Sequence, residues 1–253
     1  MQLARSLLFN ALFYVMTLVM MILGAPTVLW GRRGVIFLAK TWARSTLGLL
    51  AITCGTRAEA RGLENVPKGG FILASKHQSF LESLVIVVHA DDFAFAYKRE
   101  LGWIPLFGWY LVAAEQLSID RARGSSALPE LARKTGALLR QGRQLLIFPE
   151  GTRRAPGAPP RYKYGVTHLY RTLDATVVPV AVNTGLFWPR RKLVRRPGVC
   201  TVEYLPPIAP GLSPEDFSRE LQSRIESASA RLTDEALARD PSLAAAMAAP
   251  GAA

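Results

Sequence analysis

The sequence predicts an α/β domain whose mainly parallel sheet is flanked by helices and preceded by an N-terminal two-helix membrane anchor. Three observations predict it. Residues 1–54 hold two long apolar runs. From residue 62 onward, short apolar runs typical of buried strands alternate with stretches of helical period. Hydrophobic residues make up 50% of the 253 residues while the formal net charge is +12. We therefore divide the chain into an anchor at 1–54, a main domain at 55–240 and a disordered tail at 241–253.

The first apolar run has no charged residue from position 6 to position 31. As a helix, Leu7–Trp30 would be about 36 Å long, which is enough to cross the hydrocarbon core. Pro26 can kink this helix or end it early. A cleaved signal peptide is the alternative, but the run is long for one and no convincing A-x-A site follows it.

The second apolar run, Val35–Cys54, carries Lys40 and Arg44 on one helical face. This pattern is typical of an amphipathic helix at the membrane interface. The positive charge of the chain implies an anionic partner. No zinc-ligand spacing, RNP-type block or basic heptad helix is present, so we expect the partner to be membrane lipid and not nucleic acid.

The main domain is expected to alternate strands with helices. The expected strands are Phe71–Ala74, Phe93–Tyr97, Glu115–Ile119, Gln144–Phe148, Thr176–Val182 and Val199–Leu205. The expected helices are Ser79–His89, Ser125–Gln141, Lys163–Leu173 and Pro214–Ala238. Such alternation indicates a mainly parallel sheet, in which ligands tend to bind at the carboxyl ends of the strands.

His77 and Glu82 stand at the junction between the first of these strands and the first helix. A carboxylate about one helical turn beyond a histidine can reach back to one ring nitrogen. It then fixes the tautomer and leaves the other nitrogen free to take a proton. The alternative is that Glu82 only completes a capping box with Ser79 at the start of the helix.

The strand at 144–148 is followed by a second polar segment at a strand end. Pro149 and Gly151 end this strand sharply and present Glu150, Thr152 and Arg153 at its carboxyl end. A guanidinium can bind a phosphate through two parallel hydrogen bonds, so Arg153 is a candidate phosphate ligand. Taken alone, the segment also fits an ordinary turn.

Four blocks together resemble the glycerolipid acyltransferase family, over about residues 61–210. The blocks are His77–Glu82 (H-x4-E), Lys98–Trp109, Phe148–Arg153 (F-P-E-G-T-R) and Val178–Val182. They occur in family order with similar separations, and the segment from Ile119 to Arg121 also resembles a family element. Glu82 departs from the family pattern, which more often has Asp, but a longer carboxylate can still orient the imidazole.

The resemblance implies a membrane-bound acyltransferase. Such an enzyme moves a fatty acyl group from acyl-carrier protein or coenzyme A to the sn-2 hydroxyl of 1-acyl-glycerol-3-phosphate, giving phosphatidate. No serine nucleophile, metal or cofactor is implied beyond the thioester co-substrate. The implied roles are His77 as general base, Glu82 as its orienting carboxylate, Lys98 as an oxyanion ligand, and Arg153, Glu150, Gly151, Thr152 and Arg121 as the substrate phosphate site.

Two other functions stay open. One is acyl transfer to another lysolipid, such as a lyso-ornithine lipid; the other is a catalytically idle lipid-binding or scaffold protein. The loop Phe187–Arg196 mixes aromatic and basic residues and is either a second membrane contact or a solvated loop. Cys54 and Cys200 fit no disulfide or metal pattern, which favours a reducing cytoplasm. With the resemblance, this implies the cytoplasmic side of a bacterial inner membrane.

Overall fold

The structure, a computed structural model, describes residues 1–119 and 126–247, and it describes Lys98 by its backbone alone. In these residues, seven strands form one sheet in the order β1-β7-β6-β2-β5-β3-β4. The strands are β1 (Thr56–Arg61), β2 (Phe71–Ser75), β3 (Phe93–Lys98), β4 (Leu117–Ile119), β5 (Gln144–Ile147), β6 (Val177–Val182) and β7 (Gly198–Tyr204). Only the β6–β7 pair is antiparallel, so the predicted mainly parallel sheet is confirmed.

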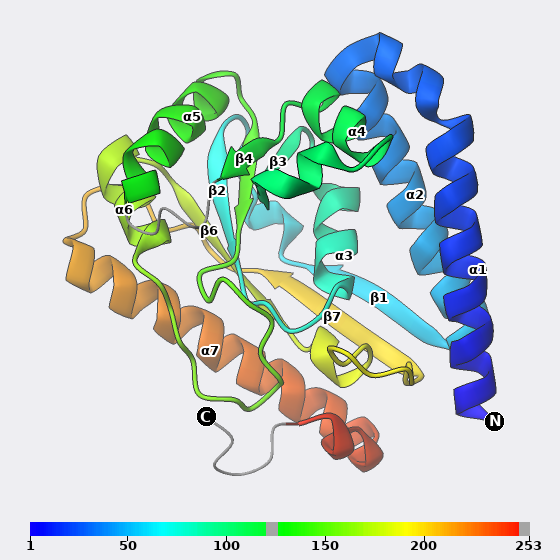
Figure 1. Cartoon of the computed structure of the whole chain (residues 1–253). Coiled ribbons are helices and arrows are strands. Elements are labelled where there is room, and N and C mark those ends of the chain that lie inside the picture. Colours follow the sequence, from blue (N-terminus) through cyan, green and yellow to red (C-terminus); the bar gives the residue numbers. More distant parts are fainter. Residues whose placement is uncertain (120–125, 248–253) are drawn as a thin grey trace.

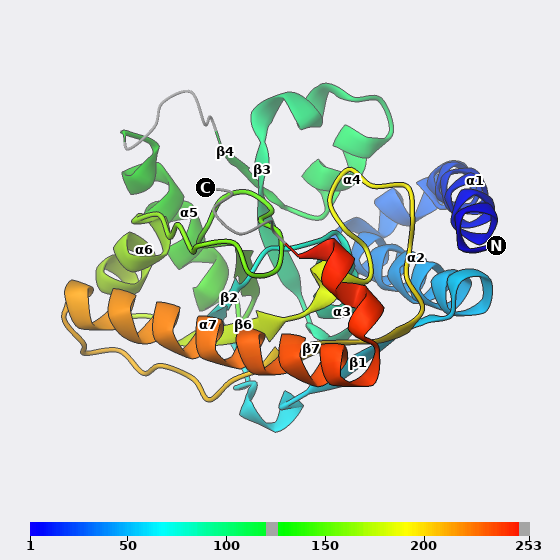
Figure 2. The ribbon, with the colours of Figure 1, turned by 90° about the horizontal axis from the view of Figure 1, so that it is seen from below.

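Helices cover both faces of the sheet (Figures 1 and 2). They are α1 (Gln2–Leu23), α2 (Gly31–Cys54), α3 (Leu81–His89), α4 (Phe107–Ala113), α5 (Leu128–Arg140), α6 (Gly165–Leu173) and α7 (Pro214–Arg239). Helices α5, α6 and α7 lie on one face; α3 lies on the other, with α2 and then α1 outside it.

Strand β2 lies inside the sheet and is buried on both faces, as parallel strands usually are. Ile72 and Ala74 pack toward α5, α6 and α7. Phe71 and Leu73 point the other way and pack against α3. This alternation explains why the run of apolar residues reads as a buried strand in the sequence.

Two elements were not predicted. Strand β1 has the polar sequence Thr-Arg-Ala-Glu-Ala-Arg, which lacks the apolar run typical of a buried strand. It can be polar because it lies at the edge of the sheet, where it pairs with β7. Helix α4 begins at Phe107, near the end of the block Lys98–Trp109, and continues to Ala113. The sequence shows no helical period there. Strand β4 begins at Leu117 instead of Glu115, because Glu115 has a φ of +50° and cannot continue a strand.

The expected disordered tail does not start at residue 241, which corrects the sequence prediction. Pro241–Ala246 form a 3₁₀ helix whose N-cap, Asp240, accepts a hydrogen bond from Ser242 N. Leu243 is buried in a cluster with Leu186 and Phe187. These partners lie more than fifty residues earlier in the chain, so composition could not reveal the contact. Residues 248–253 lie outside the part of the chain that the structure describes.

The N-terminal helices form a hairpin that runs along the flank of the main domain (Figure 1). Helix α1 ends at Leu23, and Pro26 lies in a short 3₁₀ helix, Ala25–Trp30. Of the two effects expected of Pro26, a kink or an early end of the helix, the early end is confirmed. Both Gln2–Leu23 and Ala25–Cys54 are long and apolar enough to cross a membrane. Yet Ala43 and Leu50 of α2 belong to an apolar cluster shared with the main domain. The hairpin is therefore part of the folded body.

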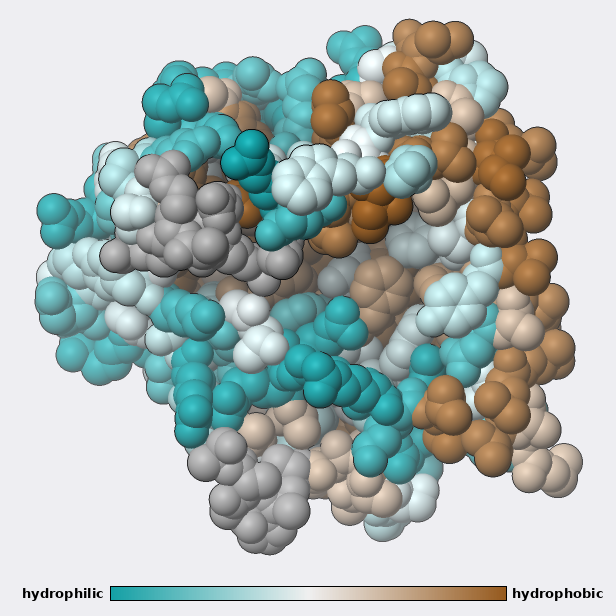
Figure 3. All heavy atoms as spheres, viewed as in Figure 1, coloured by the Kyte–Doolittle hydropathy of each residue, from teal (hydrophilic) through white to brown (hydrophobic). Residues whose placement is uncertain are grey.

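Helix α1 carries apolar side chains on its outward face, unlike a surface helix of a soluble protein. Its inward face holds Phe9 and Ser6, both fully buried, and Thr17, which accepts a hydrogen bond from Trp42 Nε1 at 3.0 Å. Its outward side chains are apolar: Leu8, Val15 and Leu18 are 54%, 61% and 57% exposed. Figure 3 shows these apolar side chains gathered along α1 at the right edge of the molecule. A helix of this kind is stable where its surroundings are hydrocarbon.

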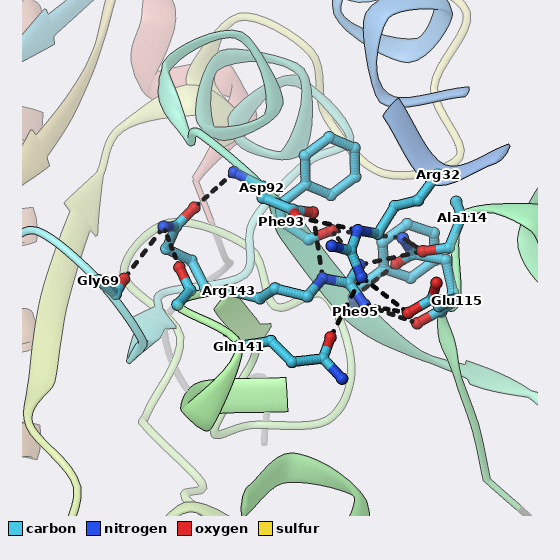
Figure 4. Close-up of polar contacts among 12 residues, drawn as sticks. Arg32, Gly69, Asp92, Phe93, Phe95, Ala114, Glu115, Gln141 and Arg143 are labelled. Atoms are coloured by element: carbon cyan, nitrogen blue, oxygen red, sulfur yellow. Dashed lines mark hydrogen bonds and ion pairs between the residues drawn. The ribbon is translucent and has the colours of Figure 1, made fainter. Parts of the chain in front are cut away.

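Ion pairs hold the start of α2 at the edge of the sheet opposite the strands' carboxyl ends (Figure 4). Arg32 of α2 pairs with Asp92 at 3.1 Å and with Glu115 at 2.8 Å. Arg143, which is almost fully buried, also contacts Asp92 at 3.1 Å and donates to the carbonyl of Ala114. Burial lowers the pKa of Arg143, and Asp92 opposes that shift. This cluster fastens the anchor to the amino ends of β3, β4 and β5.

Candidate active site

His77 lies immediately beyond β2, at the carboxyl edge of the sheet. Its Nδ1 lies 2.7 Å from Glu82 Oε1 at the start of α3. The imidazole stacks on the ring of Phe148, which follows β5, with ring centroids 3.7 Å apart and planes 17° apart. No hydrogen-bond partner for Nε2 occurs among residues 1–119 and 126–247, so that nitrogen can accept a proton from a substrate.

The contacts of Glu82 fit both roles that the sequence left open. Its carboxylate is fully buried and accepts hydrogen bonds from the backbone N–H groups of Gln78 and Ser79 at 3.0–3.1 Å. These bonds cap the turn before α3, which is one half of a capping box; α3 begins at Leu81, and Ser79 Oγ accepts from Leu81 N at 3.2 Å. The same carboxylate also contacts His77. The hydroxyl of Thr184 donates to its Oε2 at 2.6 Å. Five donor contacts therefore hold the carboxylate in one orientation toward the imidazole.

Thr184 was not predicted, although a signal existed. It stands two residues beyond the block Val178–Val182, and β6 pairs directly with β2. In a parallel pair, residues that follow neighbouring strands meet at the same edge of the sheet. Gly185 N donates to the side chain of Gln78 at 3.1 Å, so the turn after β6 also positions the residue after His77.

Glu150 lies in the interior of the site and not at its surface. Its Oε1 accepts a hydrogen bond from Lys76 Nζ at 3.1 Å, and both side chains are at most 3% exposed. Lys76 also pairs with Glu226 of α7 at 2.7 Å, and Tyr162 donates to Glu226 at 2.9 Å. Burial raises the pKa of Glu150, and Lys76 opposes that shift. The network joins the residue before His77 to the loop that carries Arg153. No motif in the sequence pointed to Glu226 or Tyr162.

The loop after β5 brings Arg153 to the rim of the site. Gly151 has a φ of +65°, and a Cβ there would come within 3.1 Å of Lys163 Nζ, so glycine suits this turn. Thr152 is exposed and Arg153 is partly exposed. Arg154 N donates to the carbonyl of His77 at 2.8 Å, which ties the loop to the His77 segment.

Two other predicted site residues cannot be placed by their side chains. Lys98 ends β3, which pairs with β5, so its backbone lies at the same edge of the sheet as His77. Arg121 lies outside the residues that the structure describes. No group of three or more His, Cys, Asp or Glu side chains that could hold a metal ion occurs at positions 1–119 and 126–247.

An apolar cavity of about 220 Å³ lies between the anchor and the main domain. Its walls come from α1, α2, α3, β3 and α4, and include Met20, Val35, Trp42, Phe95 and Phe107. Trp42 also packs edge-on against Phe80 with ring centroids 5.9 Å apart. Phe80 lies three residues after His77 in the turn before α3, so this contact links the wall of the cavity to the segment that carries the candidate base.

Comparison with known proteins decides the family. The Acyltransferase family model matches residues 57–183, half of the chain. The chain belongs to the acyltransferase family. A 1-acyl-sn-glycerol-3-phosphate acyltransferase of Pseudomonas aeruginosa is 35% identical over 75% of this chain and 74% of its own. The human 1-acyl-sn-glycerol-3-phosphate acyltransferase alpha is 31% identical over 64% of this chain and 59% of its own.

The fold also matches a solved structure. The crystal structure of the 1-acyl-sn-glycerophosphate acyltransferase of Thermotoga maritima superposes with a TM-score of 0.78 at 23% identity, covering 92% of this chain and 98% of that one. The α/β acyltransferase fold with two N-terminal apolar helices is thereby confirmed. The predicted family resemblance is confirmed as well.

Proposed function

We propose that this acyltransferase moves a fatty acyl group from an acyl thioester to the sn-2 hydroxyl of 1-acyl-glycerol-3-phosphate, giving phosphatidate. The observation that carries the proposal is the His77–Glu82 pair at 2.7 Å, with the second imidazole nitrogen free. The named relatives support this acceptor. The donor is acyl-carrier protein or coenzyme A thioester, and no other cofactor takes part. An intact pair with Arg153 beside it argues against an idle lipid-binding protein.

In the proposed reaction, His77 Nε2 takes the proton of the acceptor hydroxyl as its oxygen attacks the thioester carbonyl. Glu82 stabilises the imidazolium that forms. The tetrahedral intermediate then expels the thiolate, and the imidazolium returns the proton to that sulfur. We retain Lys98 as the candidate ligand of the oxyanion, since such donors contribute roughly 3 kcal/mol each in known sites. The apolar cavity beside Trp42 would receive a fatty acyl chain.

We place the phosphate of the acceptor against Arg153. The exposed Thr152 and the tight turn at Gly151 would shape the same loop, and Arg121 is a further candidate ligand. Glu150 would act from the interior, because its pairing with Lys76 holds the loop in place. An acceptor without phosphate, such as a lyso-ornithine lipid, is the competing substrate class.

Arg153→Ala is expected to lower kcat/KM for a phosphate-bearing acceptor by about 30-fold or more. A charge-assisted hydrogen bond from a partly buried group typically contributes about 2–3 kcal/mol. The measurement is initial-rate kinetics of the purified enzyme with 1-acyl-glycerol-3-phosphate and with a lyso-ornithine lipid. Donor saturation should change little. Equal loss for both acceptors would assign Arg153 a structural role, and a preference of the unaltered enzyme for the ornithine acceptor would overturn the substrate proposal.

We further propose that α1 lies in one leaflet of the bacterial inner membrane, with the site on its cytoplasmic side. Helix α2 packs against α3 and β1, so a hairpin that crossed the bilayer would carry the flank of the main domain into hydrocarbon. The exposed apolar face of α1 supports partial immersion instead. Two free buried cysteines and a bacterial relative support the cytoplasmic side.

Charges on the outward face of α1 are expected to detach the enzyme from membranes without unfolding it. Val15→Lys with Leu18→Lys should weaken association with vesicles by about 100-fold or more, since a lysine in a hydrocarbon environment costs roughly 2.5 kcal/mol. Deletion of the hairpin would be a poorer test, because α2 completes an apolar cluster of the main domain. Vesicle flotation measures the loss, and thermal unfolding in detergent checks the fold. Val15→Leu is the control; unchanged flotation of the double lysine variant would refute the immersion of α1.

A further inference from the structure

The loop of residues 187–196, here called the basic loop, touches both blocks that build the active site. Ser79 Oγ donates a hydrogen bond to the carbonyl of Trp188 at 2.7 Å. Arg190 Nη1 donates to the carbonyl of Arg153 at 3.0 Å. Since Arg154 N is bonded to the carbonyl of His77, these contacts place the guanidinium of Arg190 at the rim of the site, beside Arg153.

The basic loop is held from beneath by Arg195. This side chain is 7% exposed, packs over the ring of Trp188 at 4.4 Å and donates to Asn10 Oδ1 of α1 at 3.0 Å. Burial lowers its pKa to about 10. Arg195 therefore cannot serve as a lipid contact, which corrects its expected place among the basic surface residues of this loop. Its role is to fix the loop against α1, so that Arg190 is presented from a defined position.

Neither Arg153 nor Arg190 pairs with a carboxylate in the part of the chain that the structure describes. The nearest acidic side chain of the loop after β5, Glu150, is already paired with Lys76. An anion at this rim of the site would be attracted by both cationic side chains. A guanidinium has five N–H donors, and the contact with Arg153 uses one from Arg190. Donors therefore remain for a second acceptor.

We propose that Arg190 is a second ligand of the acceptor phosphate and makes the enzyme selective for a phosphomonoester. This inference rests on the proposed function. A phosphomonoester carries a charge of about −1.5 to −2 at pH 7 and three acceptor oxygens, so two guanidinium groups match it. A phosphodiester headgroup carries one charge and has fewer free oxygens, so it gains less from the second arginine.

The test uses full-length purified enzyme in neutral detergent micelles. Arg190→Ala should lower kcat/KM for 1-acyl-glycerol-3-phosphate by about 10- to 100-fold. It should leave turnover of a monoacylglycerol, the KM for the thioester donor and the melting temperature unchanged. Arg190→Lys should recover part of the loss, because it keeps the charge but not the planar fork. Arg191→Ala is the matched control: it removes the adjacent exposed arginine, which has no contact with Arg153, and should change kcat/KM by less than about twofold.

Each alternative predicts a different result. Equal loss for phosphate-bearing and phosphate-free acceptors would mean that Arg190 only braces the loop. A raised KM for the donor would assign it to the phosphates of the donor. A defect seen with anionic vesicles but not in micelles would assign it to bulk membrane headgroups. Any of these overturns the inference, as does normal activity of Arg190→Ala. If Arg153→Ala nevertheless lowers kcat/KM for the phosphate-bearing acceptor alone, the proposed function survives the failure of this inference.

Discussion

His77→Ala is expected to lower turnover by roughly 10²–10⁴-fold, the usual cost of losing a general base. The imidazole is held between Glu82 and the ring of Phe148, with Nε2 left without a partner in the described structure. No other side chain in this block could take the proton of the acceptor hydroxyl. The measurement is single-turnover and steady-state acyl transfer by the purified variant.

Controls separate loss of chemistry from loss of fold or of membrane contact. His89 stands at the exposed end of α3 and its Nδ1 contacts the carbonyl of Val85, so His89→Ala should retain near-normal turnover. His77→Ala should float with vesicles as the unaltered enzyme does, because the outward face of α1 is untouched. Near-normal turnover by His77→Ala would refute the proposed mechanism.

Glu82→Gln is expected to lower turnover on the order of 10²-fold or more, because a neutral amide stabilises the imidazolium less and holds the wrong tautomer as readily as the right one. The change preserves side-chain shape in a fully buried position. The loss should therefore appear in kcat, with little change in the KM for either substrate. Glu82→Asp keeps the charge and should lose much less activity, as the family pattern with Asp implies.

Thr184→Val provides a matched comparison for Glu82. It removes one of the donors that hold the carboxylate, at 2.6 Å, but leaves the contact with His77 in place. Its effect on turnover should be smaller than that of Glu82→Gln. If Glu82→Gln is harmless to turnover yet lowers the melting temperature, Glu82 acts only as the cap of the turn before α3.

The candidate base lies where three neighbouring strands of the sheet end. Thr184, His77 and Phe148 follow β6, β2 and β5, which are neighbours in the sheet. The apolar cavity lies on the α3 side of the sheet, and Trp42 in its wall packs against Phe80 in the turn after His77.

Local pattern alone predicted a large part of the architecture. Apolar runs such as Phe71–Ala74 and Thr176–Val182 are recognisable because strands buried on both faces need apolar residues at every position. The charge-free run of α1 is recognisable for a similar reason, since hydrocarbon excludes charge. The pairing of His77 with Glu82 also followed from spacing, because five positions across a strand-to-helix turn bring the two side chains together.

The sequence by itself thus determined the α/β class, the two apolar N-terminal helices and the contact between His77 and Glu82. Only the tertiary structure decided what depends on contacts between distant segments. Thr184 reaches Glu82 across 102 positions, and Lys76 reaches Glu226 across 150. Arg195 looked like a surface charge, but its guanidinium is buried against Asn10, 185 positions earlier. Periodicity reports only which face of an element is apolar; partner and surroundings are set by how the elements pack.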